Sequence, residues 1–326
     1  MSFLIVALLA FAAPTEAPDV GPLVRALWLV QRHGTPETLS PANDQRVKGV
    51  LSKALAKDGV ISLPELGGFM APDVFHKLAG SDSQLDSAEV SQALASAAPE
   101  SRTKLATKLR EHADYLKTTF DLIDDPHREA GEKLARWIAS NYEPGKPLHV
   151  TIVCTGNSRR SIMGSSMGNL AAAYYGMPEI RFHSGGTSPT AFNSRTVSAL
   201  KAIGFVVEPN GAEAERGEPK TANPVYRVSW GEGFEATEFS KHYGDKANPQ
   251  EGFAALMVCG EADAACPFVK GASLRVSMPY LDPKIYDEGA YESAKYAERR
   301  DDIGRLMLSV MMQARGEMFS KELHGR

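Results

Sequence analysis

The stretch His149-Val-Thr-Ile-Val-Cys154-Thr-Gly-Asn-Ser-Arg-Arg160-Ser161, which continues to Gly176, decides the fold of the C-terminal part of the chain. Its first part is a short, apolar, β-branched run, and this pattern predicts a buried strand. Its last part, Ser161 to Gly176, is rich in small and apolar residues and ends in glycine, which predicts a helix. A loop with the spacing Cys-x5-Arg-Ser therefore joins the end of a strand to the start of a helix.

The segment from Cys154 to Ser161, called the Cys154 loop below, has the features of an anion site. A loop entering a helix N-terminus presents backbone N–H groups and the positive end of the helix dipole. The same field favours a thiolate at Cys154, and Arg160 offers a forked donor to a tetrahedral oxyanion. We expect Ser161 to donate to the thiolate and Asn157 to brace the loop. The other candidate anion-binding residues are Thr155, Gly156, Ser158 and Arg159. The alternative is a buried structural cysteine.

Composition narrows the class of protein. The chain has 326 residues, enough for two domains, and its 43% hydrophobic and 23% charged residues are ordinary for a globular protein. A net charge of −4 gives no reason to expect nucleic-acid binding. The cysteines are Cys154, Cys259 and Cys266, and such a sparse, odd set does not predict a disulfide framework.

The first 13 residues form an apolar run that is too short to span a bilayer. The run fits the apolar region of a signal peptide, although the usual basic residues before it are missing. We therefore expect residues 1–20 to be a signal peptide and the mature protein to be exported, to the periplasm for example, without a membrane span. If the segment is not a signal, the protein is expected to be cytoplasmic.

Residues 21–122 are expected to form a helical region without a catalytic centre, and apolar residues at helical spacing predict one helix over residues 101–122. Arg32-His33-Gly34 also occurs in histidine phosphatases, but the Arg and Pro that should follow are absent, so we interpret it as structural. Two stretches, 58–65 and 82–89, resemble the back half of a calcium-binding EF-hand loop. The first and third ligand positions are Ala54 and Ala56 in one stretch and Leu78 and Gly80 in the other. A calcium-free helical pair is predicted, with a weak calcium site as the alternative.

Strand and helix patterns alternate in residues 123–326. Strands are predicted at 180–184, 225–229, 253–258 and 274–278, and helices at 125–142, 191–204 and 291–315. Asp125 is expected to cap the first of these helices, and residues 209–222 are expected to form a loop. This order predicts an α/β fold with a parallel sheet flanked by helices. Ligands bind at the carboxyl ends of such strands, where the sequence places Cys154, Cys259 and the residues after Met278.

The segment Cys259-Gly-Glu-Ala-Asp-Ala-Ala-Cys266 is interpreted as a redox pair, with two buried thiols as the alternative. On a straight helix the two Cα atoms would be about 10 Å apart. A disulfide needs less than about 7 Å. The segment is therefore expected to be a loop, or to refold when it is oxidised.

Asp282-Pro283 follows the last predicted strand. A carboxylic acid on this loop could protonate a leaving group at the Cys154 loop. The alternative is an ordinary Asp-Pro turn.

At these residues the chain resembles the low-molecular-weight protein tyrosine phosphatase fold family, and within it most closely the thioredoxin-coupled arsenate reductases. Cys154, Asn157, Arg160 and Ser161 match the phosphate-binding loop and Asp282 the family's acid. The resemblance also covers the Cys259/Cys266 pair and the segment 183–189. Residues 159, 162–166 and 206–252 and the N-terminal region depart from the family pattern.

The resemblance implies an arsenate reductase that uses no cofactor and takes electrons from an external dithiol such as thioredoxin. The alternative is a phosphatase that hydrolyses phosphoesters through a phosphocysteine. A third interpretation is an exported module that binds an oxyanion without turnover. No metal is expected at the Cys154 loop.

Overall fold

The structure, a computed structural model, describes residues 60–62, 84–86, 99–143, 145–218 and 220–323. The chain divides into two compact units, one of residues 104–314 and one of residues 1–103 with 315–326. All candidate catalytic residues belong to the unit of residues 104–314. The expected signal peptide and Arg32-His33-Gly34 lie outside the described residues. No helix in the described part of the chain is long and apolar enough to cross a membrane.

In the other unit, the described elements within residues 1–103 are the helix α6 (Glu100–Thr103) and a short strand pair, β1 (Val60–Ser62) and β2 (Gln84–Asp86). The two strands are antiparallel, and Ile61 lies opposite Leu85. These are the central aliphatic positions of the two EF-hand-like stretches. The acidic residues at the ends of both stretches lie outside the described residues, so the calcium prediction stays a prediction.

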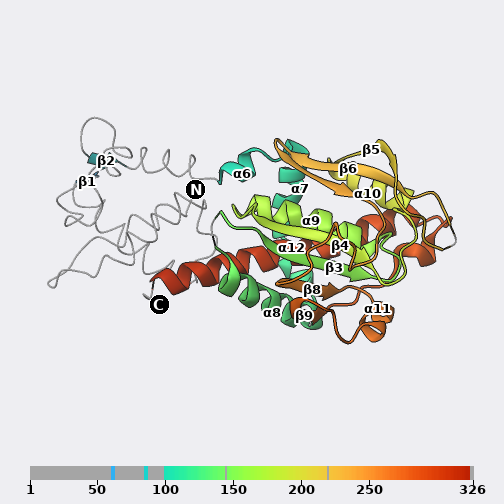
Figure 1. The fold of residues 1–326 in the computed structure, drawn as a ribbon. Helices are drawn as coiled ribbons and strands as arrows, with labels where there is room; N and C mark the ends of the chain where they lie inside the picture. Colours follow the sequence, from blue (N-terminus) through green and yellow to red (C-terminus); the bar gives the residue numbers. More distant parts are fainter. Residues whose placement is uncertain (1–59, 63–83, 87–98, 144, 219, 324–326) are drawn as a thin grey trace. The chain divides into compact units, whose positions relative to one another are not determined.

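The unit of residues 104–314 is built on a four-stranded parallel sheet. Its strands are β3 (Leu148–Cys154), β4 (Ile180–Gly186), β8 (Phe253–Met257) and β9 (Ala272–Ser277). Their order is β4-β3-β8-β9, with helices packed against the sheet (Figure 1). This arrangement confirms the predicted α/β fold with a parallel sheet flanked by helices. The carboxyl ends of β3, β4 and β8 meet at one edge, since Cys154 pairs with Gly186 and Val153 with Met257.

Helix α9 (Arg160–Tyr174), which follows the Cys154 loop, packs closely on β3 and β4. All of its residues are buried, so small residues are needed where it crosses the strands. A Cβ on Gly164 would lie 2.7 Å from Ile152, and one on Gly168 would overlap the ring of Phe182. The small-residue sequence of this helix is therefore a packing requirement that holds the start of the helix against the end of β3.

Three more helices complete this packing: α7 (Thr107–Lys117), α8 (Asp125–Asn141) and α12 (Glu292–Leu323). Gly304 of α12 faces Met167 of α9, and Gly131 of α8 faces Leu306 of α12. Helix α7 contacts α9 and lies in the unit of residues 104–314, although residues 101–122 were expected to belong to the N-terminal helical region.

Two local predictions were wrong near these helices. The single helix expected over residues 101–122 is divided into α6, α7 and the 3-10 helix η2 (Phe120–Leu122). The residue that caps α8 is Asp124, not Asp125, because the Asp124 side chain accepts a hydrogen bond from the His127 backbone N–H at 2.9 Å.

A second, antiparallel sheet follows helix α10 (Ser194–Ile203). It contains β5 (Val206–Glu213), β6 (Pro224–Gly231) and β7 (Phe234–Glu238), with β6 in the middle. The sequence predicted β6 but placed a loop over residues 209–222. Strand β5 was missed because seven of its eight residues are exposed, so it lacks the alternation that marks a half-buried strand. The remaining elements are α11 (Gly260–Ala265) and the 3-10 helix η3 (Pro283–Tyr286).

Gly168→Ala should lower the free energy of unfolding by about 1–3 kcal/mol, because the added methyl overlaps Phe182 in a packed interior. Gly260→Ala is the matched control, since a Cβ there meets nothing within 4 Å. Urea unfolding measures both variants. Equal stability of the two variants would contradict the close packing of α9 on β4.

Candidate active site

Cys154 is the last residue of β3, and its side chain is buried at the start of the Cys154 loop. Its Sγ lies 3.1 Å from Ser161 Oγ. The Asn157 side-chain amide donates to the same Oγ at 2.9 Å. Because this amide occupies an acceptor site of Ser161, the hydroxyl hydrogen is free to be donated to the sulfur. Such a hydrogen bond stabilises a thiolate more than a neutral thiol.

Asn157 holds the loop from inside. It is fully buried and has a φ of 42°, in the left-handed region that asparagine enters more easily than most residues. Its Oδ1 accepts the backbone N–H of Lys241 at 2.8 Å, while its amide donates to Ser161. Both ends of the side chain are therefore engaged, which fixes the curvature of the loop.

Four carbonyl groups of the loop are turned toward residues 187–193, which follow β4. The oxygens of residues 154, 155, 156 and 158 accept backbone N–H groups of residues 187, 188, 190 and 193 at 2.8–3.2 Å. In contrast, the backbone N–H groups of residues 155–160 donate to no acceptor in the described ranges. A loop with its carbonyls turned outward and its amides unused is suited to bind an anion.

Gly186 allows this close approach of the loop to β4. A Cβ at this position would lie 2.6 Å from the carbonyl oxygen of Thr155 and 2.8 Å from the backbone nitrogen of Asn157. In the sequence, Gly186 belongs to the segment 183–189, which was noted only as part of the family resemblance. Its physical role is to leave room for the backbone of the Cys154 loop.

Arg160 connects the loop to Asp282. Its guanidinium is buried and donates to the Tyr280 carbonyl oxygen at 2.9 Å and to Asp282 Oδ2 at 2.7 Å. Asp282 also accepts the backbone N–H of Lys284 at 3.0 Å and so caps η3. The structure thus brings Cys154, Arg160 and Asp282, which lie far apart in the sequence, to one edge of the sheet.

Arg159 has a different orientation from Arg160. Its Nε donates to the Tyr296 hydroxyl at 2.6 Å, and its NH2 donates to Asp287 at 3.1 Å. Burial, reinforced by the hydrogen bond to Asp287, raises the pKa of Tyr296 to about 12, so this phenol stays protonated. The guanidinium of Arg159 is engaged by these partners, and what it offers the loop is its backbone N–H. Sequence reasoning gave no sign of Asp287 or Tyr296, because no motif joins them to the loop.

Cys259 lies beside the Cys154 loop. It directly precedes α11, its side chain is buried, and its Sγ lies 3.4 Å from the hydroxyl of Thr155. Cys266 follows the last residue of α11 and is half-buried next to Tyr243. Both cysteines are free thiols. Residues 260–265 form a helix and not a loop, so of the two expected arrangements only the second remains: a disulfide between the two cysteines requires α11 to refold.

Glu261 is an acidic residue that the sequence analysis missed. Its own backbone N–H and then the nearby charge of Arg160 lower the pKa of its carboxyl. The carboxylate also interacts with the Cys259 side chain. Glu261 therefore places a negative charge close to both the Arg160 and Cys259 side chains.

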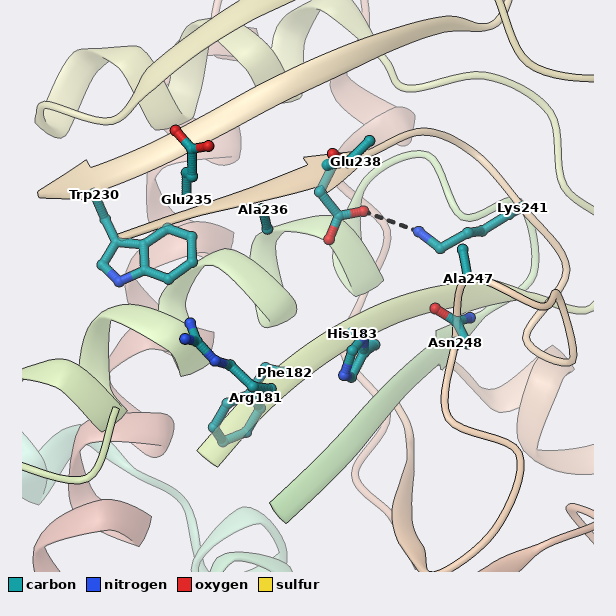
Figure 2. A pocket seen from close by; sticks show the side chains of 11 residues that line it. Arg181, Phe182, His183, Trp230, Glu235, Ala236, Glu238, Lys241, Ala247 and Asn248 are labelled. Carbon is teal, nitrogen blue, oxygen red and sulfur yellow. Dashed lines mark hydrogen bonds and ion pairs between the residues drawn. The ribbon is translucent and has the colours of Figure 1, made fainter. Parts of the chain in front are cut away.

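A buried ion pair supports the loop from behind. Lys241 Nζ lies 3.2 Å from Glu238 Oε2, and both side chains are at most 5% exposed (Figure 2). Glu238 also accepts the hydroxyls of Ser165 in α9 and Ser184 in β4, at 3.0 and 2.7 Å. The backbone N–H of Lys241 donates to Asn157. The ion pair, whose charged groups all have partners, therefore stabilises the far side of the Cys154 loop.

No protein-family model matches this sequence, and neither does any curated protein sequence. In the described part of the chain, no group of three or more His, Cys, Asp or Glu side chains could hold a metal ion. The assignment of a function therefore depends on the geometry of the Cys154 loop and its neighbours.

Iodoacetamide should alkylate Cys154 through its thiolate, and inorganic phosphate should slow the reaction by filling the loop. Ser161→Ala should slow alkylation about tenfold, because the hydroxyl that stabilises the thiolate is lost. Ser198→Ala, at an exposed serine of α10, is the matched control. Mass spectrometry of the Cys154 peptide gives the rates. Alkylation that is insensitive to phosphate would contradict an anion site in this loop.

Proposed function

We propose that residues 123–326 form a member of the low-molecular-weight protein tyrosine phosphatase fold family that acts as an arsenate reductase. The observation that carries this proposal is the position of Cys259, whose Sγ is 3.4 Å from Thr155, the residue next to Cys154. A second thiol, Cys266, lies one short helix away. A hydrolase needs the Cys154 loop but has no use for this pair of free cysteines.

In the first step, the loop amides and Arg160 hold arsenate, and the Cys154 thiolate attacks arsenic. A sulfur–arsenic bond forms, and one arsenic–oxygen bond breaks. Asp282 gives a proton to the departing oxygen, which leaves as water. The contact of Asp282 with Arg160 supports this role, because it keeps the acid next to the group that would bind the oxyanion.

In the second step, the Cys259 thiolate attacks the Cys154 sulfur. A Cys154–Cys259 disulfide forms, and the electron pair of the sulfur–arsenic bond stays on arsenic, which leaves as arsenite. Cys266 then attacks Cys259 and releases Cys154 as a thiolate. The two electrons that reduce arsenic come from the thiols, and an external dithiol of the thioredoxin type would reduce the Cys259–Cys266 disulfide. An exported form would need an exported dithiol.

A phosphatase is the second candidate function, and the Arg160–Asp282 pair supports it as well as the reductase. Cys154 would form a phosphocysteine that water hydrolyses, with Asp282 as the acid for the leaving group. This reaction uses the same loop and needs neither Cys259 nor Cys266.

Arg160→Lys should lower kcat/KM about 10²–10³-fold on either substrate, because lysine keeps the charge but loses the planar fork. Arg227→Lys, at an exposed arginine of β6, is the matched control and should retain wild-type kinetics. Steady-state assays with arsenate and with an aryl phosphate measure both variants. Wild-type activity of Arg160→Lys would contradict the assignment of the anion site.

Asp282→Asn should lower kcat about 10²-fold or more while phosphate inhibition is retained, because its proposed role is proton transfer. Phosphate inhibition constants and kcat for an aryl phosphate separate the two effects. If kcat keeps its wild-type value, another group is the acid.

Cys266→Ser should reduce one arsenate per protein molecule and then stop with a Cys154–Cys259 disulfide, because no thiol remains to release Cys154. Cys259→Ser should not complete even one reduction. Mass spectrometry after exposure to arsenate detects the disulfide, and arsenite release gives the stoichiometry.

Aryl phosphate hydrolysis is the control for these two variants, because it should survive in both. If both variants reduce arsenate repeatedly, or if neither forms the disulfide while both still hydrolyse the phosphoester, the reductase proposal is wrong. In the second case the protein is a phosphatase.

A further inference from the structure

Two adjacent arginines of the Cys154 loop hold the two ends of one short segment, residues 282–287, called the Asp282 segment below. The guanidinium of Arg160 donates to Asp282 Oδ2 at 2.7 Å, at the first residue of the segment. The guanidinium of Arg159 donates to Asp287 Oδ2 at 3.1 Å, at the last residue. The proposed acid therefore lies at one end of a segment whose other end is also anchored to the loop.

The Asp282 segment is stiff, because η3 lies between its two carboxylates. Asp282 Oδ1 accepts the backbone N–H of Lys284 at 3.0 Å, and the backbone N–H of Asp287 donates to the Lys284 carbonyl oxygen, also at 3.0 Å. Pro283, which is buried, restricts the backbone at the first position of this helix. With a rise of about 2 Å per residue, the two ends are about 10 Å apart. An anchor at one end therefore limits the movement of the other end.

The anchor at Asp287 receives contacts from three elements: the Cys154 loop, α10 and α12. Asp287 Oδ1 accepts the hydroxyl of Tyr296 in α12 at 2.7 Å, and that hydroxyl accepts the Nε–H of Arg159 at 2.6 Å. Arg195 of α10 lies 3.8 Å from the same Asp287 oxygen and pairs with Glu292 of α12 at 2.6 Å. The side chains of Arg159 and Asp287 are only 14% and 21% exposed, so solvent screens their ion pair only in part.

The anchor at Asp282 weakens when this residue acts as an acid. Asp282 must carry a proton before it can protonate a departing oxygen. A neutral carboxyl group no longer forms an ion pair with Arg160, so the contact between them weakens. Arg160 must also turn toward the oxyanion, and its buried Nε has no hydrogen-bond partner in the described ranges. At the moment of the reaction, the position of Asp282 therefore depends on the anchor at Asp287.

We propose that Asp287 is a positioning residue for the acid. Its contacts with Arg159 and Tyr296 keep the Asp282 segment next to the Cys154 loop after Asp282 has left Arg160 to protonate the departing oxygen. This role of Asp287 rests on the proposed function, because it presupposes that Asp282 is the acid. It applies to arsenate and to phosphoesters, since both reactions protonate a departing oxygen.

The test uses the full chain and two aryl phosphates. Phenyl phosphate has a basic leaving group that needs a proton, whereas the leaving group of para-nitrophenyl phosphate departs with little help. Asp287→Asn should lower kcat/KM about tenfold for phenyl phosphate and by less than about twofold for para-nitrophenyl phosphate, because a misplaced acid costs most where the proton is needed most. The inhibition constant of inorganic phosphate should keep its wild-type value, which would show that the Cys154 loop is intact.

Tyr296→Phe removes the hydroxyl that joins Arg159 to Asp287, and it should show the same dependence on the leaving group with a smaller loss. Asp125→Asn, at an exposed aspartate of α8, is the matched control and should keep wild-type kcat/KM for both substrates.

The double variant Asp282→Asn/Asp287→Asn separates a positioning role from a general structural one. If Asp287 acts only through Asp282, the double variant should hydrolyse phenyl phosphate as fast as Asp282→Asn alone. An equal loss for both substrates in Asp287→Asn, or a further loss in the double variant, would overturn the positioning role.

The single variants distinguish this inference from the proposed function. Wild-type kinetics of Asp287→Asn beside an impaired Asp282→Asn would contradict the role of Asp287 alone. Wild-type kinetics of Asp282→Asn would show that the proposed acid is wrong, and the role of Asp287 would be wrong with it.

Discussion

The buried side chain of Asn157 is the interaction on which the site depends. It joins the hydroxyl of Ser161 at the start of α9 to the backbone of Lys241, which lies 84 residues later in the sequence. With Asn157 in a left-handed conformation, four carbonyls of the loop turn outward to the segment after β4, and the loop amides stay unused. Without this brace the loop would lose the curvature that suits it to an anion. The geometry of the site therefore depends on one side chain, that of Asn157, whose amide nitrogen and oxygen both form hydrogen bonds.

Packing provides the frame for that brace. Helix α9 lies close to the sheet because Gly164 and Gly168 face Ile152 and Phe182, and Gly186 lets the loop backbone approach β4. These contacts fix the distance between the end of β3 and the start of α9. As a result, the positive end of the helix dipole, the backbone amides of the loop and the Cys154 sulfur lie close together. The buried ion pair between Glu238 and Lys241 supports the far side of the loop.

The sequence was sufficient to predict β3, α9 and the parallel sheet, because their patterns are local: an apolar β-branched run, small residues and a terminal glycine. It also placed Cys154, Cys259 and Asp282 at the same edge, since strands in a parallel sheet share their direction. It could not predict the engagement of Arg159 by Asp287 and Tyr296, or the brace through Lys241, because these contacts join distant segments that share no motif. The helix between Cys259 and Cys266 was missed since six residues give too short a pattern to recognise.

The central claim is that the Cys154 loop holds a tetrahedral oxyanion. A crystal structure of the Cys154→Ser protein with bound phosphate tests it most directly, since the variant cannot form a phosphocysteine. We expect the phosphate oxygens to accept the backbone N–H groups of residues 155–160 and the guanidinium of Arg160, with Asp282 moved from Arg160 toward the anion. A loop without phosphate at a saturating concentration, or phosphate bound elsewhere on the protein, would contradict the account.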